Sequence, residues 1–289
     1  GLLVSQSFNR PLERRWVRHR FTNSAASYDQ VAVLQREFGD RLLERMEPVH
    51  IEPQRILEIG AGTGYVTRGM LKGYRKADVI AVDVAKGMLR QNMRCAPWLR
   101  KPRLICADLH SLPFVDGAFD LVISNLTLQW SDDVPRALAE MRRVISPNGA
   151  VFFSTFGPQT LQELRGSWAE VDDYEHVHRF ADKHTIGDCM MAAGFSGPVV
   201  DSEIITLTYS QPREVMRDLK QLGAANLSPA RSRGLISPHR LGRVEAAYAI
   251  AHRDQQGRVP ATYEVVYGHA WGGPAKGCNN LEGSCQVCL

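Results

Sequence analysis

A glycine-rich loop that follows a short apolar strand is the part of this chain whose residue types and spacing best suit ligand chemistry. Residues 55–65 read Arg-Ile-Leu-Glu-Ile-Gly-Ala-Gly-Thr-Gly-Tyr, with glycines at Gly60, Gly62 and Gly64. Such glycines let the backbone approach a ligand that a Cβ would push away. A dinucleotide site has the spacing G-x-G-x-x-G, whereas this loop has G-x-G-x-G with an acid, Glu58, just before it. The spacing favours S-adenosylmethionine over a nicotinamide dinucleotide, although a tight strand-to-helix turn alone would also explain the glycines.

Polar side chains follow several of the apolar segments that come after this loop. Four segments have the continuous apolar composition of buried strands, namely residues 77–82, 103–107, 119–124 and 149–154. The first three are followed directly by Asp83, Asp108 and Asn125. Ligands of open parallel sheets bind at the carboxyl ends of the strands, so we expect these side chains and Glu58 to converge on one cofactor. A helix N-cap is the alternative role for each acid.

Together, the glycine loop and the strand-end residues resemble the class I S-adenosylmethionine-dependent methyltransferases. The resemblance implies an α/β, Rossmann-like fold with a mostly parallel seven-stranded sheet and helical insertions that form a substrate lid. It also implies that Glu58, Gly60, Gly62 and Gly64 hold the methionine end of the cofactor, Asp83 the ribose, and Asp108 with Leu109 the adenine, with further contacts from Gln35, Met88 and Asn125. Packing in the core of a helix is the alternative role of Met88.

The length and composition of the chain set its expected domain organisation. A chain of 289 residues with 44% hydrophobic content is large enough for one α/β core with elaborations. We expect a basic N-terminal arm at residues 1–20, a methyltransferase domain at 21–272 with insertions at about 158–180 and 211–258, and a Gly/Cys tail at 273–289. No apolar run approaches the ~20 residues that span a bilayer, and the N-terminus lacks a signal-peptide pattern. A cytoplasmic protein without membrane contact is therefore expected.

Both ends of the chain are expected to lie outside the folded domain. Three of the six cysteines, Cys278, Cys285 and Cys288, lie in the tail, and their C-x6-C-x2-C spacing does not match a structural zinc site. We therefore expect no metal site and a disordered tail, with metal binding or redox chemistry as the alternatives. The N-terminal arm has five arginines between Arg10 and Arg20 and is expected to be mobile.

Periodic apolar residues predict helices around the core. Residues 31–46 carry apolar side chains at three- and four-residue steps, which predicts an amphipathic helix. As a lid over the cofactor, this helix would place Tyr28 and Gln35 near the methyl donor; packing on the sheet alone would explain the pattern equally well. Further helices are expected at 158–179 and 182–193, and further strands at 199–209 and 261–270.

The second insertion carries a local excess of positive charge. Between Arg213 and Arg258 there are nine Arg or Lys against four Asp or Glu, whereas the whole chain has a formal charge of only +4. A solvated helix face would explain this excess, but a basic surface beside a methyl-transfer pocket indicates an acidic partner. A nucleic-acid surface needs aromatic residues that stack on bases, and only Tyr248 is present in this segment. The pattern therefore favours a protein partner or a carboxylate.

Longer motifs narrow the resemblance. Residues 124–130 read Ser-Asn-Leu-Thr-Leu-Gln-Trp, residues 176–180 read His-Val-His-Arg-Phe, and residues 216–224 read Met-Arg-Asp-Leu-Lys-Gln-Leu-Gly-Ala. With these motifs, residues 15–272 resemble the malonyl-acyl carrier protein O-methyltransferases of biotin synthesis. The resemblance implies methyl transfer from S-adenosylmethionine to the free carboxylate of a malonyl thioester on acyl carrier protein, with S-adenosylhomocysteine as the second product. The malonyl methyl ester then starts pimeloyl formation.

The same resemblance implies a partner and substrate-site residues. Acyl carrier protein is strongly acidic, which suits the basic insertion, and Arg179, Arg217 and Lys220 are expected to bind carrier or substrate. A malonyl carboxyl has a pKa of about 3 to 4 and is already an anion at neutral pH, so no general base is required. The expected catalytic residues are Arg217 as the carboxylate anchor, and Tyr28 and His176 as hydrogen-bond partners of the second oxygen or the thioester carbonyl. The alternatives are an ion pair of Arg217 with Asp218 or Glu214, and structural hydrogen bonds for Tyr28 and His176.

Other functions share this fold and cofactor loop. They are a methyltransferase of another small carboxylate or of a quinone precursor, an S-adenosylmethionine-binding assembly or modification factor of a respiratory complex, and a nucleic-acid methyltransferase. The first has no need for a basic surface that docks a carrier. We expect a monomer that binds no nucleic acid.

Overall fold

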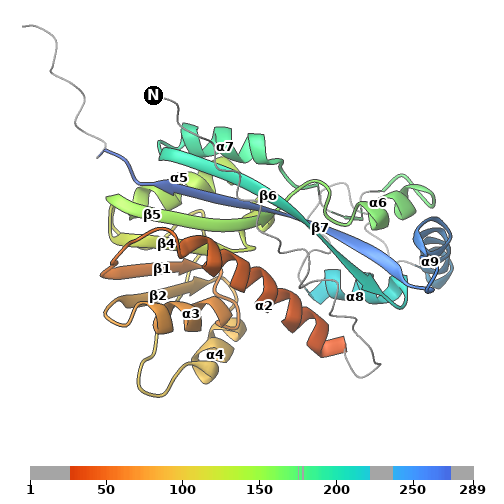
Figure 1. Ribbon diagram of the computed structural model, residues 1–289, viewed down its shortest axis with the longest axis horizontal. Coiled ribbons are helices and arrows are strands. Elements are labelled where there is room, and N and C mark those ends of the chain that lie inside the picture. The colour runs from red at the N-terminus through yellow and green to blue at the C-terminus, as the bar shows by residue number, and fades with distance from the viewer. Residues whose placement is uncertain (1–26, 175, 178, 222–236, 275–289) are drawn as a thin grey trace, which may run out of the picture.

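The structure, a computed structural model, describes residues 27–174, 176–177, 179–221 and 237–274 (Figure 1). The basic arm at 1–20 and the three tail cysteines Cys278, Cys285 and Cys288 lie outside the described residues. The predictions made for these two segments therefore stay predictions.

A seven-stranded sheet in the order β3-β2-β1-β4-β5-β7-β6 forms the centre of the molecule. Its strands are β1 Arg55–Ile59, β2 Asp78–Asp83, β3 Arg103–Cys106, β4 Phe119–Asn125, β5 Ile145–Phe156, β6 Ser196–Tyr209 and β7 Val259–Trp271. The pairs from β3 to β5 are parallel, and β7 runs antiparallel to both β5 and β6. The mostly parallel seven-stranded sheet predicted from the sequence is confirmed. The strand order reverses between β1 and β4, where open α/β sheets form a ligand crevice.

Helices cover both faces of this sheet. They are α2 Ser27–Met46, α3 Tyr65–Gly73, α4 Lys86–Cys95, the short 3-10 helix η1 Leu128–Trp130, α5 Val134–Val144, α6 Gln162–Ala169, α7 Lys183–Ala192, α8 Pro212–Gln221 and α9 Pro238–His252. Alternate residues of β1 belong to different cores: Ile56 packs in a cluster with residues of α2 and α3, whereas Leu57 packs in one with residues of α5 and α7. A strand buried on both faces reads as a continuous apolar run, which is why these strands were predictable.

The helix expected at residues 158–179 is wrong in its length. Only Gln162–Ala169 is helical, and the N–H groups of Val171 and Asp172 both donate to the carbonyl of Trp168, at 2.9 and 3.0 Å. The Asp172 carboxylate then accepts the N–H of Tyr174, so a side chain takes over a backbone donor that a longer helix would use. The next expected helix is confirmed as α7, where the Asp182 side chain caps the N–H of Thr185 at 2.8 Å.

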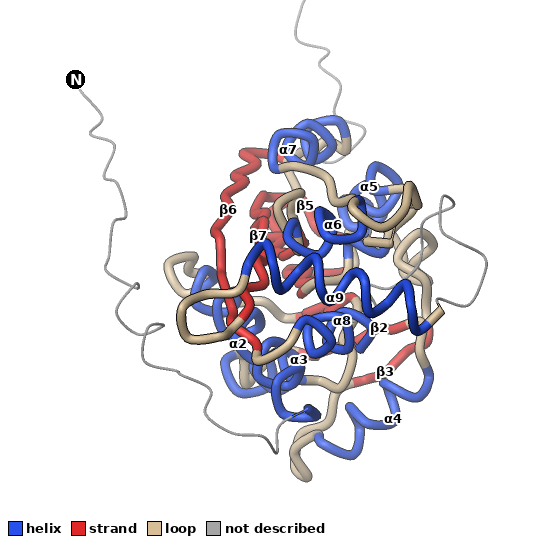
Figure 2. Tube along the Cα trace, turned by 90° about the vertical axis from the view of Figure 1, so that its right-hand side faces the viewer, coloured by secondary structure: helices blue, strands red, loops and turns tan. Residues whose placement is uncertain are grey.

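The two insertions supply helices that lie together at one end of the sheet. Figure 1 shows α6, α8 and α9 beyond the end of the core strands, where the long strands β6 and β7 reach them, and Figure 2 shows the same three helices in front of the sheet. Within α8, Asp218 is 0% exposed, and neither of its carboxyl oxygens has a hydrogen-bond partner among the described residues. The nearby Tyr209 hydroxyl is hydrogen-bonded to Tyr263. Burial raises the pKa of Asp218 to about 6.

We expect Asp218→Asn to stabilise the protein at pH 7.5 and to leave its stability little changed near pH 4. The folded protein holds this proton more tightly than the unfolded chain, whose Asp has a pKa near 3.9. Stability is therefore lost as the pH rises from about 4 to about 6 and stays lower above that range. The asparagine removes this loss, which corresponds to about 2 to 3 kcal/mol at pH 7.5. Urea unfolding across this pH range measures the effect.

The exposed Asp188 of α7 provides the matched control. Asp188→Asn makes the same chemical change at a solvated site, so it should leave the free energy of unfolding unchanged at each pH. A gain that was equal for both variants, or an Asp218→Asn variant that was less stable at pH 7.5, would contradict a pKa of Asp218 that burial raises.

Candidate functional site

A cavity of about 340 Å³ lies at the carboxyl ends of β1, β2 and β4. Its volume falls in the range of small-ligand pockets. Eight of the residues predicted to bind the cofactor line it, namely Gln35, Glu58, Gly60, Gly62, Asp83, Met88, Leu109 and Asn125. Gly64 and Asp108 do not line it. The sheet thus brings together side chains that are up to ninety positions apart in the sequence.

Two glycines of the loop have different neighbours. Gly62 has φ +52°, and a Cβ built on it would meet no protein atom within 4 Å, although the residue lines the cavity. Gly64 has φ +90°, and a Cβ there would lie 2.4 Å from the Asn92 side-chain oxygen. Both positions use backbone angles that favour glycine. Gly62 is therefore the position open toward a ligand, whereas Gly64 is required by the close approach of α4.

Asp83 ends β2 with its carboxylate held by two backbone donors. Its Oδ2 accepts the N–H of Gly62 at 2.9 Å, and its Oδ1 accepts the N–H of Ala85 at 2.8 Å. These bonds fix the orientation of the side chain at the wall of the cavity. An ionised carboxyl oxygen accepts more than one hydrogen bond, so both oxygens can also accept from a ligand with two neighbouring hydroxyls.

Glu58 belongs to a buried polar chain that the sequence did not reveal. The carboxyl group is only 2% exposed and accepts a hydrogen bond from the Thr67 hydroxyl, and Thr67 Oγ1 in turn accepts from Asn92 Nδ2 at 3.0 Å. The other amide atom, Asn92 Oδ1, is buried and has no partner among the described residues. Burial raises the pKa of Glu58 to about 8, against the opposing effects of Thr67 and Arg68. In this structure Glu58 is therefore mostly protonated at neutral pH.

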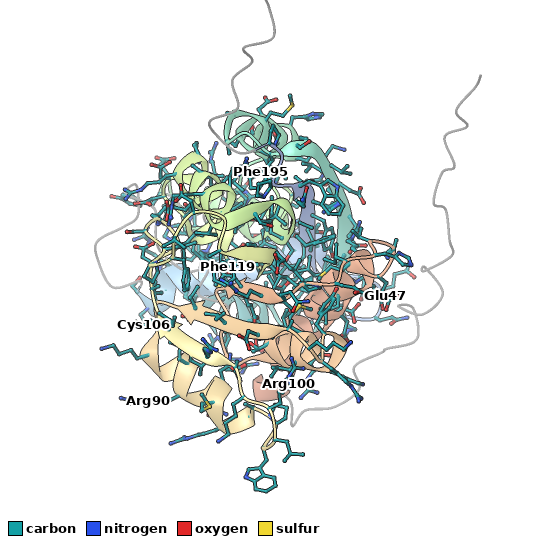
Figure 3. All side chains as sticks on the ribbon, turned by 90° about the vertical axis from the view of Figure 1, so that its left-hand side faces the viewer. Glu47, Arg90, Arg100, Cys106, Phe119 and Phe195 are labelled. Carbon is teal, nitrogen blue, oxygen red and sulfur yellow. The ribbon has the colours of Figure 1, made fainter. Side chains whose placement is uncertain are left out.

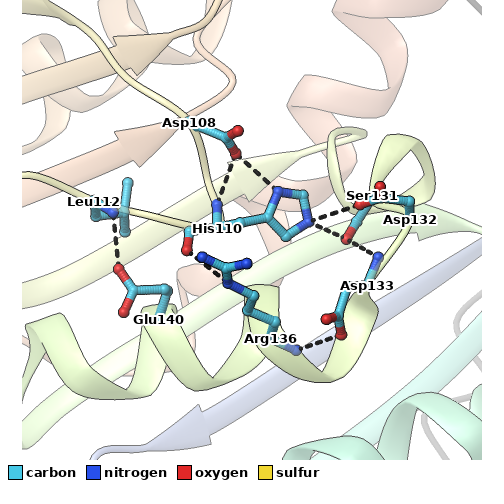
Figure 4. Close-up of polar contacts among 8 residues, drawn as sticks. All are labelled: Asp108, His110, Leu112, Ser131, Asp132, Asp133, Arg136 and Glu140. Carbon is cyan, nitrogen blue, oxygen red and sulfur yellow. Dashed lines mark hydrogen bonds and ion pairs between the residues drawn. The ribbon is translucent and has the colours of Figure 1, made fainter.

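Asp108 has a different position from the one expected. Its Oδ1 accepts the backbone N–H of His110 and bonds to the imidazole Nδ1, both at 2.8 Å, and His110 Nε2 bonds to Ser131 Oγ at 2.6 Å (Figure 4). The backbone bond from His110 lowers the pKa of Asp108, so the side chain is ionised. Asp108 thus fixes the loop after β3, and it is the next residue, Leu109, that reaches the cavity.

Helix α5 holds the other side of this loop. Arg136 donates from Nε to the carbonyl of His110 at 3.1 Å, and Glu140 accepts the N–H of Leu112 at 2.8 Å (Figure 4). These two side chains come from one face of α5, one turn apart. No sequence pattern indicated these two contacts, because the loop and the helix are joined only through tertiary contacts.

The structure places three of the predicted substrate residues, His176, Arg179 and Arg217, outside the cavity lining. Arg217 is exposed on α8, and His176 and Arg179 line a separate cavity of about 460 Å³ beside α6. His176 Nε2 bonds to the Asp172 carboxylate at 2.8 Å, and its ring stacks on Trp168 with centroids 3.6 Å apart. These contacts match the structural alternative for His176. The side chains of Tyr28 and Lys220 lie outside the described residues.

Several cavity residues had no predicted role. They are Tyr65, Gln129, Trp130 and Phe156, among others. Gln129 is buried, donates from Nε2 to the carbonyl of Leu126 at 2.7 Å, and accepts from the Thr155 hydroxyl at 3.3 Å. Gln129 and Trp130 end the motif at 124–130, which indicated the family but not the position of these two side chains. Their position directly after β4 could have predicted that they lie near the glycine loop, because the carboxyl end of β4 lies beside that of β1.

Comparison with known proteins decides the family. A family model described as a methyltransferase domain matches residues 57–153, from β1 into β5. A malonyl-[acyl-carrier protein] O-methyltransferase of Halorhodospira halophila (strain DSM 244 / SL1) is 66% identical over 261 residues, which cover 90% of this chain and 88% of the relative. One of the same name from Laribacter hongkongensis (strain HLHK9) is 44% identical over 92% of each chain. This chain belongs to the malonyl-[acyl-carrier protein] O-methyltransferase family.

Solved structures agree with this family in their fold. The YcgJ protein of Bacillus subtilis aligns with a TM-score of 0.58 and 17% identity, covering 82% of this chain and 99% of its own. A phosphoethanolamine N-methyltransferase of Haemonchus contortus, in complex with phosphomonomethylethanolamine and S-adenosylhomocysteine, aligns with a TM-score of 0.53 and 17% identity, covering 82% of this chain and 53% of its own. At such low identity these likenesses establish the class I methyltransferase fold of this family member and nothing further.

Two other observations concern the described part of this family member only. No helix in it has the length and apolar character of a membrane span. No three side chains among its described His, Cys, Asp and Glu residues gather in a way that would hold a metal ion.

Substitution by alanine should affect stability and ligand binding differently at Gly62 and at Gly64. Gly62→Ala should lower the free energy of unfolding by only about 1 to 2 kcal/mol, the cost of a left-handed backbone. It should nevertheless weaken the binding of S-adenosylhomocysteine at least tenfold, because the methyl group enters the cavity. Gly64→Ala adds a clash with Asn92 to the same strain and should cost more stability. Thermal unfolding and calorimetric titration of each variant separate these effects; equal stability losses would contradict this division of roles.

Proposed function

We propose that this protein methylates the free carboxylate of a malonyl thioester carried by acyl carrier protein, using S-adenosylmethionine. The product is the malonyl methyl ester that starts pimeloyl formation in biotin synthesis. The 66% identity over 90% of the chain to a malonyl-[acyl-carrier protein] O-methyltransferase carries this proposal. A cytoplasmic location and a monomeric state stay predictions.

The residues of the cavity suit S-adenosylmethionine. The Asp83 carboxylate, held by two backbone amides, is oriented to accept both ribose hydroxyls. Met88 and Leu109 offer apolar contacts for an adenine ring, and Gly62 leaves space where a Cβ would otherwise stand. Glu58, which lies two residues before Gly60 and lines the cavity, is the acid proposed for the ammonium group of the methionine end. The roles proposed for Gln35, Gly60 and Asn125 rest on their positions in the cavity wall.

The proposed methyl transfer requires little acid–base catalysis. S-adenosylmethionine supplies an electrophilic methyl group on its sulfonium. The malonyl carboxyl is an anion at neutral pH, so the protein has to orient it and to exclude water that would solvate the nucleophile. Phe156 is suited to exclude water at this wall, because its ring packs against Phe38, Phe180 and Tyr263 at centroid distances of 5.8, 5.7 and 5.9 Å.

The cavity offers a donor for the substrate that the sequence did not indicate. Trp130 lines the cavity, and its indole N–H makes no hydrogen bond to another described residue. We assign it to the malonyl carboxylate or the thioester carbonyl. The exposed position of Arg217 suits a contact with the carrier better than the anchoring of a carboxylate in the cavity. Arg179, Lys220, Tyr28 and His176 keep their predicted roles as proposals.

Mass spectrometry of malonyl-loaded acyl carrier protein tests the proposed function. After incubation with the protein and S-adenosylmethionine, we expect a mass gain of one methylene group that mild ester hydrolysis reverses. The control is Asp83→Ala, which should lose the reaction because the ribose acceptor is gone. Calorimetry should show that S-adenosylhomocysteine still binds the native protein; if it binds but no mass is gained, the fold and cofactor stand and the substrate assignment is wrong.

The raised pKa of Glu58 predicts that cofactor binding depends on pH. An ammonium group beside Glu58 favours its ionised form, so binding should release its proton below pH 8. The affinity for S-adenosylhomocysteine should therefore rise with pH toward about 8, the pKa of Glu58 in the ligand-free structure, by up to tenfold per pH unit, and then level off. Arg68 and Asp83 are the other charged groups that act on Glu58.

Calorimetry in buffers of different ionisation enthalpy counts the released proton directly. Glu58→Gln is the matched control, because the amine of the ligand titrates equally against both proteins. The variant should bind with no proton release below pH 8 and with a flat profile there. If both proteins release the same number of protons, Glu58 keeps its protonation state on binding.

A further inference from the structure

The segment around α4 carries a larger excess of positive charge than the insertion does. Between Lys72 and Arg103 there are nine Lys or Arg against two Asp, an excess of seven. Two of these cations have partners: Arg100 donates to the carbonyls of Leu71, Tyr74 and Ala77, and Arg103 pairs with Asp78 at 3.3 Å. The other seven are exposed and make no ion pair or hydrogen bond with a described residue. They are Lys72, Arg75, Lys76, Lys86, Arg90, Arg94 and Lys101.

These seven cations form one surface. Lys86, Arg90 and Arg94 follow each other at four-residue steps along α4, on the side away from the buried Leu89 and Asn92. The hydrogen bonds of Arg100 tie the loop after α4 to the end of α3, which brings the cations at 72–76 beside Lys101. Figure 3 shows Arg90 and Arg100 at the same end of the molecule. We call the seven residues the α4 basic surface.

Two large apolar side chains lie in the loop that joins α4 to Lys101. Trp98 is 86% exposed and Leu99 is 88% exposed, in the loop that Arg100 fixes. Neighbouring apolar side chains that are exposed on a folded protein are typical of a binding site, and Trp is a frequent anchor of protein interfaces. The segment therefore combines exposed apolar side chains with unpaired cations.

The α4 basic surface begins at the edge of the cavity. Ala85 and Met88, at the start of α4, line the cavity, and Met88 is 46% exposed. Arg94 lies six residues further along the helix, which corresponds to about 9 Å. A partner that rests on this surface would thus hold a flexible arm close to the opening.

We propose that the α4 basic surface docks the acidic carrier protein that presents the malonyl thioester. This inference rests on the proposed function for the nature of the partner. Unpaired cations steer and orient an acidic partner, and Trp98 with Leu99 would supply the desolvated centre of the interface.

Most described cations of the insertion have partners, whereas Arg217 and Arg243 are exposed and make no ion pair or hydrogen bond with a described residue. Arg213 is held by Glu245 at 2.6 Å, and Arg240 pairs with Asp172. Between Lys72 and Arg103, Trp98 is the one aromatic ring that is fully exposed, since Tyr74 is half-buried, so nucleic acid would find few rings to stack on. A bilayer would bind an amphipathic helix by its apolar face, but the apolar side of α4 is buried in the protein through Leu89.

The test compares two substrates with one variant, Lys86→Glu/Arg90→Glu/Arg94→Glu. With malonyl-acyl carrier protein, KM should rise at least tenfold with little change in kcat, and the native KM should rise with added salt. With a malonyl thioester of pantetheine that has no carrier protein, KM should stay unchanged, because the cavity is intact. Trp98→Ala should raise KM for the carrier substrate in the same selective way.

Two further variants control for net charge and for the rival surface. The first reverses three exposed cations elsewhere, Arg55, Lys183 and Arg243, and should leave KM for the carrier substrate within about twofold, as expected when only screened long-range charge changes. The second reverses Arg217 and Lys220 on α8. If the α8 variant loses the carrier substrate and the α4 variant keeps it, or if the α4 variant loses both substrates equally, the proposal is overturned.

Failure of the proposed function would be distinguishable from failure of docking. If the native protein methylates neither substrate, calorimetric titration with unmodified acyl carrier protein still measures the interaction. Binding that is lost in the α4 variant and retained in the three-cation control supports docking without the reaction. The docking proposal is overturned if the native protein does not bind the carrier, or if the native protein and the α4 variant bind it equally. It is also overturned if the native protein binds anionic vesicles or single-stranded DNA in preference to the carrier.

Discussion

The cofactor cavity depends on the hydrogen bonds by which the end of β2 fixes the glycine loop. The carbonyl of Val82 accepts the N–H groups of Gly60 and Ala61 at 2.9 and 3.0 Å, and the Asp83 carboxylate accepts that of Gly62. The same carboxylate accepts the N–H of Ala85, where the chain enters α4. One strand end thus fixes the loop after its neighbour, orients the acid at the cavity wall and sets the start of α4. A ligand that binds here meets groups that are already in place, which lowers the ordering cost of binding.

The parts of this arrangement that the sequence predicted are those that follow from local pattern. Parallel strands buried on both faces are continuous apolar runs, so their ends could be read, and a sheet places those ends on one edge. This is why Asp83 and Asn125 were expected beside the glycine loop. The end of α6 was not predictable in the same way, because the apolar spacing continues to Val171 while the hydrogen bonds of Asp172 turn the chain.

Other features depend on contacts between residues that are distant in the sequence. Nothing near Gly64 indicates that Asn92 approaches it, and nothing near Glu58 indicates that its carboxyl is buried and mostly protonated. The positive charge around α4 could have been counted from the sequence. Its meaning could not, because only the structure separates Arg100, which donates to three carbonyls, from neighbours such as Arg90 that have no described partner.

The placement of positive charge suits a carboxylate nucleophile. No Lys or Arg is among the described residues that line the cavity, although the chain has 35 of them. A guanidinium held against the malonyl oxygens would stabilise the anion in its ground state and so reduce its reactivity, whereas interactions that strengthen only in the transition state accelerate the reaction. Neutral donors such as the Trp130 indole orient the anion while they reduce its reactivity less. Cations on the outer surface of α4 can still attract an acidic partner, so the fold separates the charge that recruits a substrate from the site that has to keep it reactive.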